Sequence, residues 1–428
     1  LKIFDADGDV AKAGHRNTPE LSKRKLDDMI TRVLIKTPPE KYISIGAVTE
    51  TMKKVRRAEI VGGGFAGLAS ACALAQRGWD VRLHERDSEL RTTGAGIYVY
   101  ENGLRVLEAL GAYEDSVQDA PLVVSREVRD DANKLISVHQ WKGASRVYSI
   151  VRQQIINALA KVAKNAGVQI VTNSEPVAAN PQGEIQFSDG RRTKADLVVC
   201  ADGVNSRLRD SLGLLVRRKF LHDGAIRYLI DKTPGETTSK AEATTVEYWS
   251  GSRRILYTPC SPTQIYIALT MRHRDRIAAT VPIDKGAWKA WFPHLATLID
   301  RLGFDGRYDR FELIRLNPWS LGRAAVVGDA AHALPPNIGQ GGGSAMMNAL
   351  SMAVYLDHFD DVTSALAEWE RKERPLTEHT QRMSVLMGMP TTWPSPLRNI
   401  FYKFATRSKW MVTQRTKIVT HRPTGTTA

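Results

Sequence analysis

A glycine-rich turn between a predicted strand and a predicted helix is the feature that most constrains the fold of this chain. Residues 58–61, AEIV, have the composition of a short buried strand, and the turn GGGFAG follows directly at 62–67. The next residues, LASACALAQRG, predict a helix that ends at Gly78, and WDVRLHE predicts a second strand at 79–85. Strand, helix and strand together predict a βαβ unit that opens a parallel sheet.

The spacing inside the turn matches G-x-G-x-x-G, the pattern that binds the pyrophosphate of a dinucleotide. Gly62 allows the tight turn, Gly64 lets a pyrophosphate approach the backbone, and Gly67 lets helix and strand pack closely. The helix N-terminus then faces the diphosphate. Glu85 ends the second strand, at the distance expected for the acid that binds ribose hydroxyls. The sequence therefore predicts a dinucleotide site, and the alternative is a glycine-rich turn without a ligand.

Composition excludes several other classes of protein. The chain has 428 residues, of which 43% are hydrophobic and 25% charged, as in ordinary globular proteins of roughly three domains. It contains no uncharged apolar run of about 18 residues, so no membrane-spanning helix is expected. The three cysteines are too widely spaced for a disulfide framework or a zinc site. We expect a cytoplasmic protein with no metal and no membrane partner.

The chain is basic, with a formal net charge of +14. Much of the excess lies in residues 401–428, which contain six lysines and arginines and no acid. No nucleic-acid-binding motif accompanies this charge, so no nucleic-acid partner is expected. A solvated basic tail is the simplest interpretation of the segment.

The rest of the chain predicts two kinds of sheet. A helix at 152–167 leads into a strand, two short strands with an SDG turn follow at 184–201, and another buried strand lies at 322–328. Strand patterns alternate with turns between about 215 and 315, which indicates an antiparallel sheet in a second lobe. Long helices are expected from about residue 342.

Two further motifs follow the glycine turn in chain order. The first is ADLVVCADGVNSRLR at 195–209, and the second is GDAAH at 328–332, which continues to PPNIGQGGG at 335–343. The three motifs together resemble the single-component, FAD-dependent aromatic hydroxylases of the para-hydroxybenzoate hydroxylase class over residues 55–360. Within that class, the sequence resembles the oxygenases of 2-methyl-3-hydroxypyridine-5-carboxylic acid.

The resemblance implies an α/β (α+β) fold, in which a Rossmann-like FAD-binding domain carries an inserted antiparallel-sheet substrate domain and C-terminal helices. The FAD-binding domain is expected at 52–125, 150–212 and 316–390, and the substrate-binding lobe at 126–149 and 213–315. Residues 1–51 are expected to be a poorly ordered extension, with the domain starting near Met52. Residues 391–428 form the basic C-terminal segment.

The resemblance also implies which residues bind FAD non-covalently. The glycine turn takes the pyrophosphate, Glu85 the adenosine ribose and Asp329 the ribityl chain, and the loop after Pro336 lies beside the flavin ring. The full set of cofactor-binding candidates is Gly62, Gly64, Phe65, Ala66, Gly67, Glu85, Arg86, Arg91, Arg152, Asp202, Asp329, Pro336, Gly341, Gly342 and Gly343.

The implied reaction uses NADH or NADPH and O2 to hydroxylate an aromatic ring, with or without ring opening. The chemistry belongs to the flavin, so no side chain is predicted to be catalytic. His332 is interpreted as a packing residue.

Three residues match substrate-pocket positions of the pyridine oxygenases: Arg227, Arg254 and Tyr266. An arginine suits a ring carboxylate. Arg253 and Arg254 are adjacent on a predicted strand, so one of them is expected to face solvent. Phe311 stands where those oxygenases have a pocket tyrosine, and a second pocket tyrosine has no counterpart at 122–127. The expected substrate is therefore a related hydroxylated pyridine or aromatic carboxylic acid.

Two alternatives remain open at this stage. One is a salicylate-hydroxylase-like enzyme for benzenoid rings, which shares the same motifs. The other is a non-catalytic binding protein on the same FAD fold. The chain is expected to act as a monomer or a homo-oligomer.

Overall fold

The predicted βαβ unit opens a parallel sheet in the computed structural model, which describes residues 55–90, 95–141, 145–236 and 242–427. Strand β1 (Arg57–Val61) leads into helix α2 (Phe65–Ala75), and β2 (Asp80–His84) returns parallel to β1. The predicted extension at 1–51 and Arg91 lie outside the described residues.

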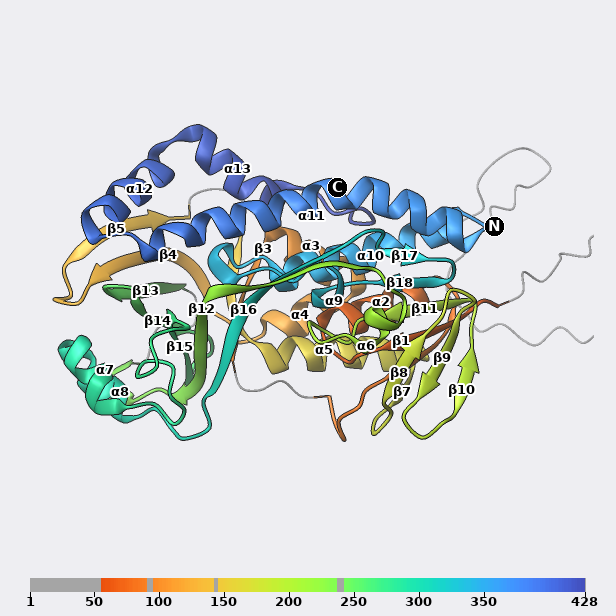
Figure 1. The fold of residues 1–428 in the computed structure, drawn as a ribbon, viewed down its shortest axis with the longest axis horizontal. Coiled ribbons are helices and arrows are strands. Elements are labelled where there is room, and N and C mark those ends of the chain that lie inside the picture. The colour runs from red at the N-terminus through yellow and green to blue at the C-terminus, as the bar shows by residue number, and fades with distance from the viewer. Residues whose placement is uncertain (1–54, 91–94, 142–144, 237–241, 428) are drawn as a thin grey trace, which may run out of the picture. The chain divides into compact units, whose positions relative to one another are not determined.

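The sheet that contains β1 and β2 has six strands in the order β17-β18-β11-β1-β2-β7 (Figure 1). All its neighbouring pairs are parallel except β17–β18. A short three-stranded sheet, β10-β9-β8, contains the hairpin with the SDG turn. The bounds of these strands are β7 (Gln169–Val171), β8 (Pro176–Ala179), β9 (Glu184–Phe187), β10 (Arg192–Lys194), β11 (Leu197–Cys200), β17 (Ser320–Leu321) and β18 (Ala324–Val326).

Small side chains allow the helices around this sheet to pack closely. The sequence of α2, FAGLASACALA, consists largely of alanine and other small residues, and residues 65–74 are all buried. The helix packs against α10 (Gly341–His358), which begins with three glycines and a serine, and against α5 (Arg152–Asn165). This sheet-and-helix core buries its apolar surface on both faces, as parallel sheets do. Neighbouring short helices are α3 (Glu101–Leu110), α4 (Tyr113–Val117), α6 (Arg207–Ser211) and α9 (Asp329–His332).

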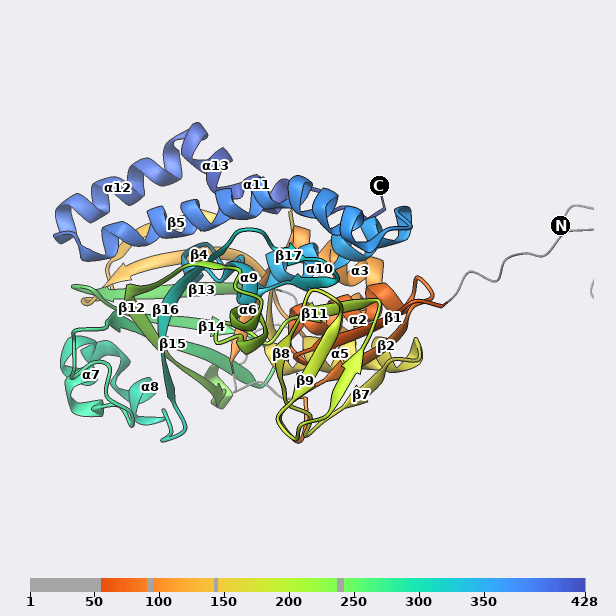
Figure 2. The same cartoon turned by 45° about the vertical axis from the view of Figure 1, so that its right-hand side comes forward.

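The second lobe is built on a larger sheet in the order β16-β12-β15-β14-β13-β4-β6-β3, with β5 paired to β4 (Figure 2). Its strands pair antiparallel except for β13 and β4, in agreement with the predicted antiparallel sheet. The bounds are β3 (Gly96–Tyr100), β4 (Leu122–Asp130), β5 (Leu135–Gln140), β6 (Val147–Val151), β12 (Leu215–Asp231), β13 (Glu242–Ser250), β14 (Arg253–Pro259), β15 (Gln264–Arg272) and β16 (Arg307–Leu316).

The register of the large sheet decides which side chains share a face. Residues 254, 256 and 258 of β14 lie opposite 270, 268 and 266 of β15, and residue 268 also lies opposite 227 of β12. Side chains alternate along a strand, so Arg227, Arg254 and Tyr266 all lie on one face. The other face carries an apolar cluster with Ile255 and Trp288, covered by α7 (Lys285–Trp291), α8 (Ala296–Asp300) and η3 (Pro293–Leu295).

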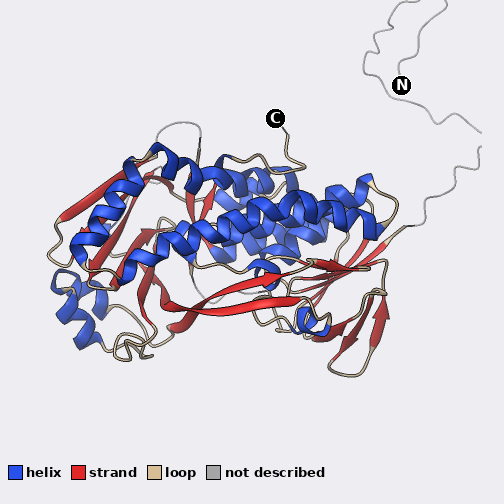
Figure 3. Cartoon of the chain, turned by 45° about the horizontal axis from the view of Figure 1, so that its top comes forward, coloured by secondary structure: helices blue, strands red, loops and turns tan. Residues whose placement is uncertain are grey.

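The C-terminal segment is folded, which corrects the interpretation of a solvated tail. The long helix α11 (Val362–Gly388) is followed by η5 (Met389–Thr392), α12 (Ser395–Arg407) and α13 (Lys409–Thr420). Helix α13 contacts α11 and α3, and α12 contacts β5; Figure 3 shows these helices gathered as a layer beside the strands. Buried Met411 and Ile418 anchor α13, because its apolar side chains find partners on the rest of the fold.

Candidate functional site

Gly62 and Gly64 border a hollow of about 270 Å³, and the three motif glycines have different environments. Gly62 has φ +106°, and a Cβ there would lie 2.3 Å from the Ala201 carbonyl oxygen. A Cβ at Gly67 would lie 1.8 Å from the Gly62 oxygen, because helix and turn are in direct contact. A Cβ at Gly64 would meet no atom of the described residues within 4 Å. Gly62 and Gly67 are therefore required by the turn itself, whereas Gly64 keeps the hollow accessible.

Glu85 lies at the rim of the same hollow and stabilises its backbone. One carboxylate oxygen accepts a hydrogen bond from the Gly63 N–H at 2.8 Å, and the other accepts one from the Asp87 N–H at 3.0 Å. Arg86 also lines the hollow, and its side chain is exposed. The acid predicted to bind ribose thus lies against the glycine turn.

The Asp-Gly motif forms the opposite side of the hollow. Asp202 accepts hydrogen bonds from the Ser206 hydroxyl and from the Leu208 N–H. Burial raises the pKa of Asp202, and the Ser206 hydrogen bond opposes that increase. Arg209, fully buried, donates to the carbonyls of Val204 at 3.0 Å and Ala330 at 3.2 Å. It therefore joins the second motif to the third.

Asp329 and Arg152 form the continuation of the site toward the second lobe. Burial raises the pKa of Asp329, against the influence of Arg152 and then Arg227. Burial lowers the pKa of Arg152, and Asp329 opposes the change. The Arg152 guanidinium carbon lies 5.1 Å from the centre of the Phe65 ring. Arg227 donates to Asp309 at 2.9 Å, so it belongs to this charged group.

The loop that follows the third motif ends at the N-terminus of a long buried helix. Pro336 begins the short helix η4 (Pro336–Ile338), and Gly341 is the first residue of α10. A Cβ at Gly341 would meet no atom within 4 Å in the part of the chain that the structure describes, whereas one at Gly342 would lie 2.8 Å from the Ile97 side chain. Gly343 lies close to the Asn102 amide. The first N–H groups of α10 therefore remain approachable beside Gly341.

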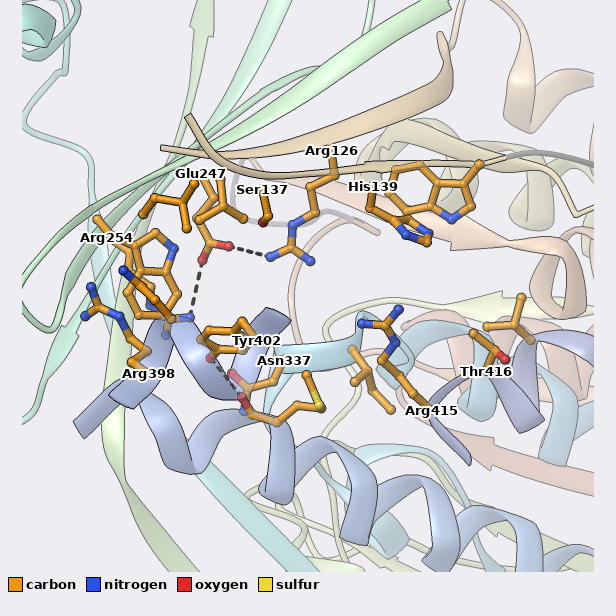
Figure 4. A pocket seen from close by; sticks show the side chains of 18 of the residues that line it. Arg126, Ser137, His139, Glu247, Arg254, Asn337, Arg398, Tyr402, Arg415 and Thr416 are labelled. Atoms are coloured by element: carbon orange, nitrogen blue, oxygen red, sulfur yellow. Dashed lines mark hydrogen bonds and ion pairs between the residues drawn. The ribbon is translucent and has the colours of Figure 1, made fainter. Parts of the chain in front are cut away.

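A separate pocket of about 150 Å³ lies between the large sheet and the C-terminal helices (Figure 4). Glu247 on β13 is shared by two guanidinium groups: Arg126 donates to it, and Arg254 donates at 3.3 Å. Although burial raises the pKa of Glu247, Arg126 and Arg254 outweigh it and hold the pKa below its ordinary value. The pocket is lined by Tyr100, Arg126, Val128, Ile136, Ser137, His139, Trp141, Glu247, Trp249, Arg254, Asn337, Ile338, Met387, Arg398, Asn399, Tyr402, Arg415, Thr416 and Val419.

The structure separates the three predicted substrate residues although they share a face. Arg254 lines the pocket and is 7% exposed, with Asp223 3.7 Å away as a second acid. Arg227 is hydrogen-bonded to Asp309. Tyr266 packs against the backbone of Gly96, where an added Cβ would lie 2.6 Å from the tyrosine Cβ. Neither of the latter two residues lines this pocket.

Arg253 lies on the face opposite Arg254, where a solvent-facing side chain was expected. Instead, its guanidinium has partners within the protein. Its guanidinium lies 3.6 Å from the centre of the Trp291 ring and 2.8 Å from an Asp275 carboxylate oxygen. The helix that covers this face supplies the tryptophan. Phe311 is buried and does not line the pocket, whereas Arg126 from the 122–127 stretch does.

Comparison with known proteins agrees with this geometry. The model of the FAD binding domain family matches residues 55–361. AqdB1 of Rhodococcus erythropolis is 42% identical over 373 residues, covering 87% of this chain and 98% of the relative. The 2-heptyl-3-hydroxy-4(1H)-quinolone synthase of Mycobacteroides abscessus is 43% identical over 350 residues, covering 80% and 92%. The chain belongs to the family of FAD-dependent monooxygenases.

A solved structure supports the same assignment. The tetrameric form of 2-methyl-3-hydroxypyridine-5-carboxylic acid oxygenase has a TM-score of 0.77 and 37% identity, covering 87% of this chain and 98% of the other. The fold class and the resemblance expected from the sequence are thereby confirmed. So is the enzyme class, with FAD, NAD(P)H and O2 as its reactants.

The residues of this monooxygenase are compatible with FAD at the predicted place. The Gly64 hollow gives a pyrophosphate access to backbone N–H groups, and Arg152 Nε and Gln340 Nε2 are buried donors without a partner among the described residues. When bound, FAD supplies hydride uptake from NAD(P)H and oxygen transfer to the ring. The N-terminus of α10 favours negative charge near Gly341.

Sequence reasoning missed most residues of the pocket. Arg126, Glu247, Arg398, Tyr402 and Arg415 come from four elements that are distant in the sequence. One signal was present on β13: Glu247 alternates with Thr245 and Trp249 on the same face of the strand, which indicates an acid on a buried face. Nothing in the local sequence of α13 indicates that Arg415 turns inward.

The described part of the chain was also examined for a membrane-spanning helix and for a cluster of metal-binding side chains. No helix there is long and apolar enough to cross a bilayer. No group of three or more potential metal ligands occurs within the same residues.

Proposed function

We propose that this monooxygenase hydroxylates an N-heteroaromatic ring of the hydroxypyridine carboxylic acid or 4-quinolone kind. The observation that carries the proposal is the pocket bordered by Asn337 and Ile338 of the predicted flavin-side loop. Trp249 and Tyr402 supply aromatic walls, and Arg126 and Arg254 supply hydrogen-bond donors. Such a pocket suits a flat ring with polar oxygen substituents.

The relatives support the same class of ring. One is named for a 3-hydroxy-4(1H)-quinolone product and the other for a 3-hydroxypyridine carboxylic acid, and both compounds are oxygenated nitrogen heterocycles. Within this proposal, the glycine turn, Glu85, Arg86, Asp202, Arg152, Asp329 and the Pro336–Gly343 loop hold FAD. Arg254 orients the substrate, while Arg227 and Tyr266 lie closer to the FAD-side residues.

The test is substrate-stimulated oxidation of NADH and NADPH by the purified holoenzyme, with oxygen uptake measured in parallel. The panel contains 2-methyl-3-hydroxypyridine-5-carboxylate, 2-heptyl-4(1H)-quinolone and salicylate. Stoichiometric stimulation by either heterocycle, with a product heavier by one oxygen atom or more, is expected. Stimulation by salicylate alone would overturn the proposal in favour of the benzenoid alternative.

We also propose that the enzyme is a homo-oligomer, because the pyridine oxygenase of TM-score 0.77 forms a tetramer. Light scattering of the holoenzyme after size exclusion is expected to give a multiple of 47.5 kDa. A mass of one chain at micromolar concentration would contradict this.

A further inference from the structure

The lining of the pocket carries more positive than negative charge. Among its described residues, four are arginines and one is an acid, Glu247. Burying charge without partners is costly, so each guanidinium must be accounted for. The four differ in how far the protein itself satisfies them.

Three of the arginines have partners within the protein. Arg126 and Arg254 share Glu247, and Arg254 also lies 3.7 Å from Asp223, which Arg272 approaches at 3.5 Å. Arg398 donates to the Gly251 carbonyl, and its guanidinium carbon lies 4.5 Å from the centre of the Trp249 ring. These groups support the wall of the pocket.

Arg415 is different from the other three. No carboxylate of the described residues lies within ion-pair distance of it, and no hydrogen bond from its guanidinium is found within the same part of the chain. Burial lowers the pKa of Arg415, and Arg126 lowers it further. Among the described residues, only Tyr100 acts to raise the pKa of Arg415. The protein therefore leaves this guanidinium uncompensated inside a pocket.

The surroundings of Arg415 favour an anion rather than water alone. Figure 4 shows Arg415 extending from α13 into the space that Arg126 and His139 approach from the sheet side. Burial, Arg415 and Arg126 all lower the pKa of His139, so the imidazole adds no positive charge at neutral pH. A single anionic oxygen in this space would face two guanidinium groups, which form strong charge-assisted hydrogen bonds.

We propose that Arg415 binds an anionic oxygen of the ring substrate, either a carboxylate or a deprotonated ring hydroxyl, and so selects anionic over neutral rings. The inference rests on the proposed function, because it names the charge state of the substrate of the same pocket. It also assigns a binding role to the C-terminal helix. An acidic hydroxypyridine fits this site better than an uncharged quinolone.

The test measures dissociation constants from ligand-induced changes in the visible spectrum of bound FAD, without NAD(P)H or turnover. The probes are 2-methyl-3-hydroxypyridine-5-carboxylate, its 5-carboxamide and its 3-methoxy analogue. The variants are Arg415→Met and Arg415→Lys, with Lys417→Met as the control because Lys417 is an exposed base on the same helix. FAD content and circular dichroism verify that each variant is folded, and Arg415→Gln replaces the methionine variant if that fails.

Arg415→Met is expected to raise the dissociation constant of the carboxylate probe by about tenfold or more. The analogue that lacks the relevant anionic oxygen should lose less than about threefold. A spared carboxamide identifies the carboxylate as the partner, and a spared methoxy compound identifies the ring hydroxyl. Arg415→Lys should fall between, and Lys417→Met should equal wild type.

Two results would overturn the inference. One is an equal loss for all three probes, which would mean that Arg415 only shapes the pocket. The other is no loss for any of them. If no pyridine binds the wild-type enzyme, the proposed substrate class fails, and benzoate then serves as the probe. An Arg415-dependent benzoate affinity would keep the anion site, and an Arg415-independent one would remove it.

Discussion

Gly64 and Gly67 differ in what an added methyl group meets. At Gly64 the methyl group would enter the hollow that we assign to the pyrophosphate, whereas at Gly67 it would collide with the Gly62 carbonyl. We expect Gly64→Ala to fold normally as apoprotein but to bind FAD at least about tenfold more weakly. Gly67→Ala should lower the free energy of unfolding of the apoprotein by about 1–3 kcal/mol, as overpacking does.

The measurements are thermal or denaturant unfolding of the apoproteins and fluorescence titration with FAD. The two variants serve as controls for each other, because they add the same methyl group three residues apart. An unchanged FAD affinity in Gly64→Ala would remove the hollow from the cofactor site. Equal destabilisation of both apoproteins would show that Gly64 also has a structural role.

Helices α6 and α9 are held together by the buried Arg209. Its replacement by methionine would leave the carbonyls of Val204 and Ala330 without their donor, and each unsatisfied buried group costs about 1–3 kcal/mol. Arg209→Met is therefore expected to destabilise the protein by about 2 kcal/mol or more, and also to weaken FAD binding because the Asp-Gly and Gly-Asp motifs would no longer be joined.

The matched control lies two residues earlier on the same helix. Arg207 pairs with Glu175 at 3.0 Å on the exposed surface, and such pairs contribute less than about 1 kcal/mol. Urea denaturation of Arg207→Met should resemble wild type, and only stability is compared because Arg207 lines the hollow assigned to FAD. If Arg209→Met behaves like Arg207→Met, the two motifs are joined by other contacts.

For the whole molecule, the structure predicts loss of stability at mildly acid pH. The His332 Nε2 lies 2.9 Å from the Asn348 amide nitrogen, so the imidazole accepts that hydrogen bond in its neutral form. Burial lowers the pKa of His332 from 6.5 to about 4. Stability from the neutral imidazole is fully present above pH 6.5 and is lost as the pH falls to about 4. The difference is on the order of 3 kcal/mol.

The measurement is the free energy of unfolding between pH 7 and pH 4 for wild type and His332→Gln. We expect the variant to lose less stability over this window, whatever its stability at pH 7. The exposed His358→Gln is the control and should follow the wild-type curve. Parallel curves for wild type and His332→Gln would assign the acid sensitivity to other groups.

The sequence by itself determined the βαβ unit, the order of the three motifs and the family to which they belong. These features depend on contacts between residues that are close in the chain, such as those in the turn at Gly62 and Gly67. The alternating patterns of the second lobe likewise predict where strands lie, but not which strands pair with each other. The fold class and the cofactor could therefore be predicted, whereas the assignment of individual cofactor contacts stays a prediction.

Only the tertiary structure decided which side chains meet in the pocket. Arg126, Glu247, Arg254 and Arg415 come from β4, β13, β14 and α13, and their meeting depends on the parallel pairing of β13 with β4 and on the docking of α13. Strand pairing and helix docking are set by the burial of apolar surface between distant segments, which no local pattern specifies. For that physical reason, a basic tail in the sequence becomes one wall of the pocket in the folded molecule.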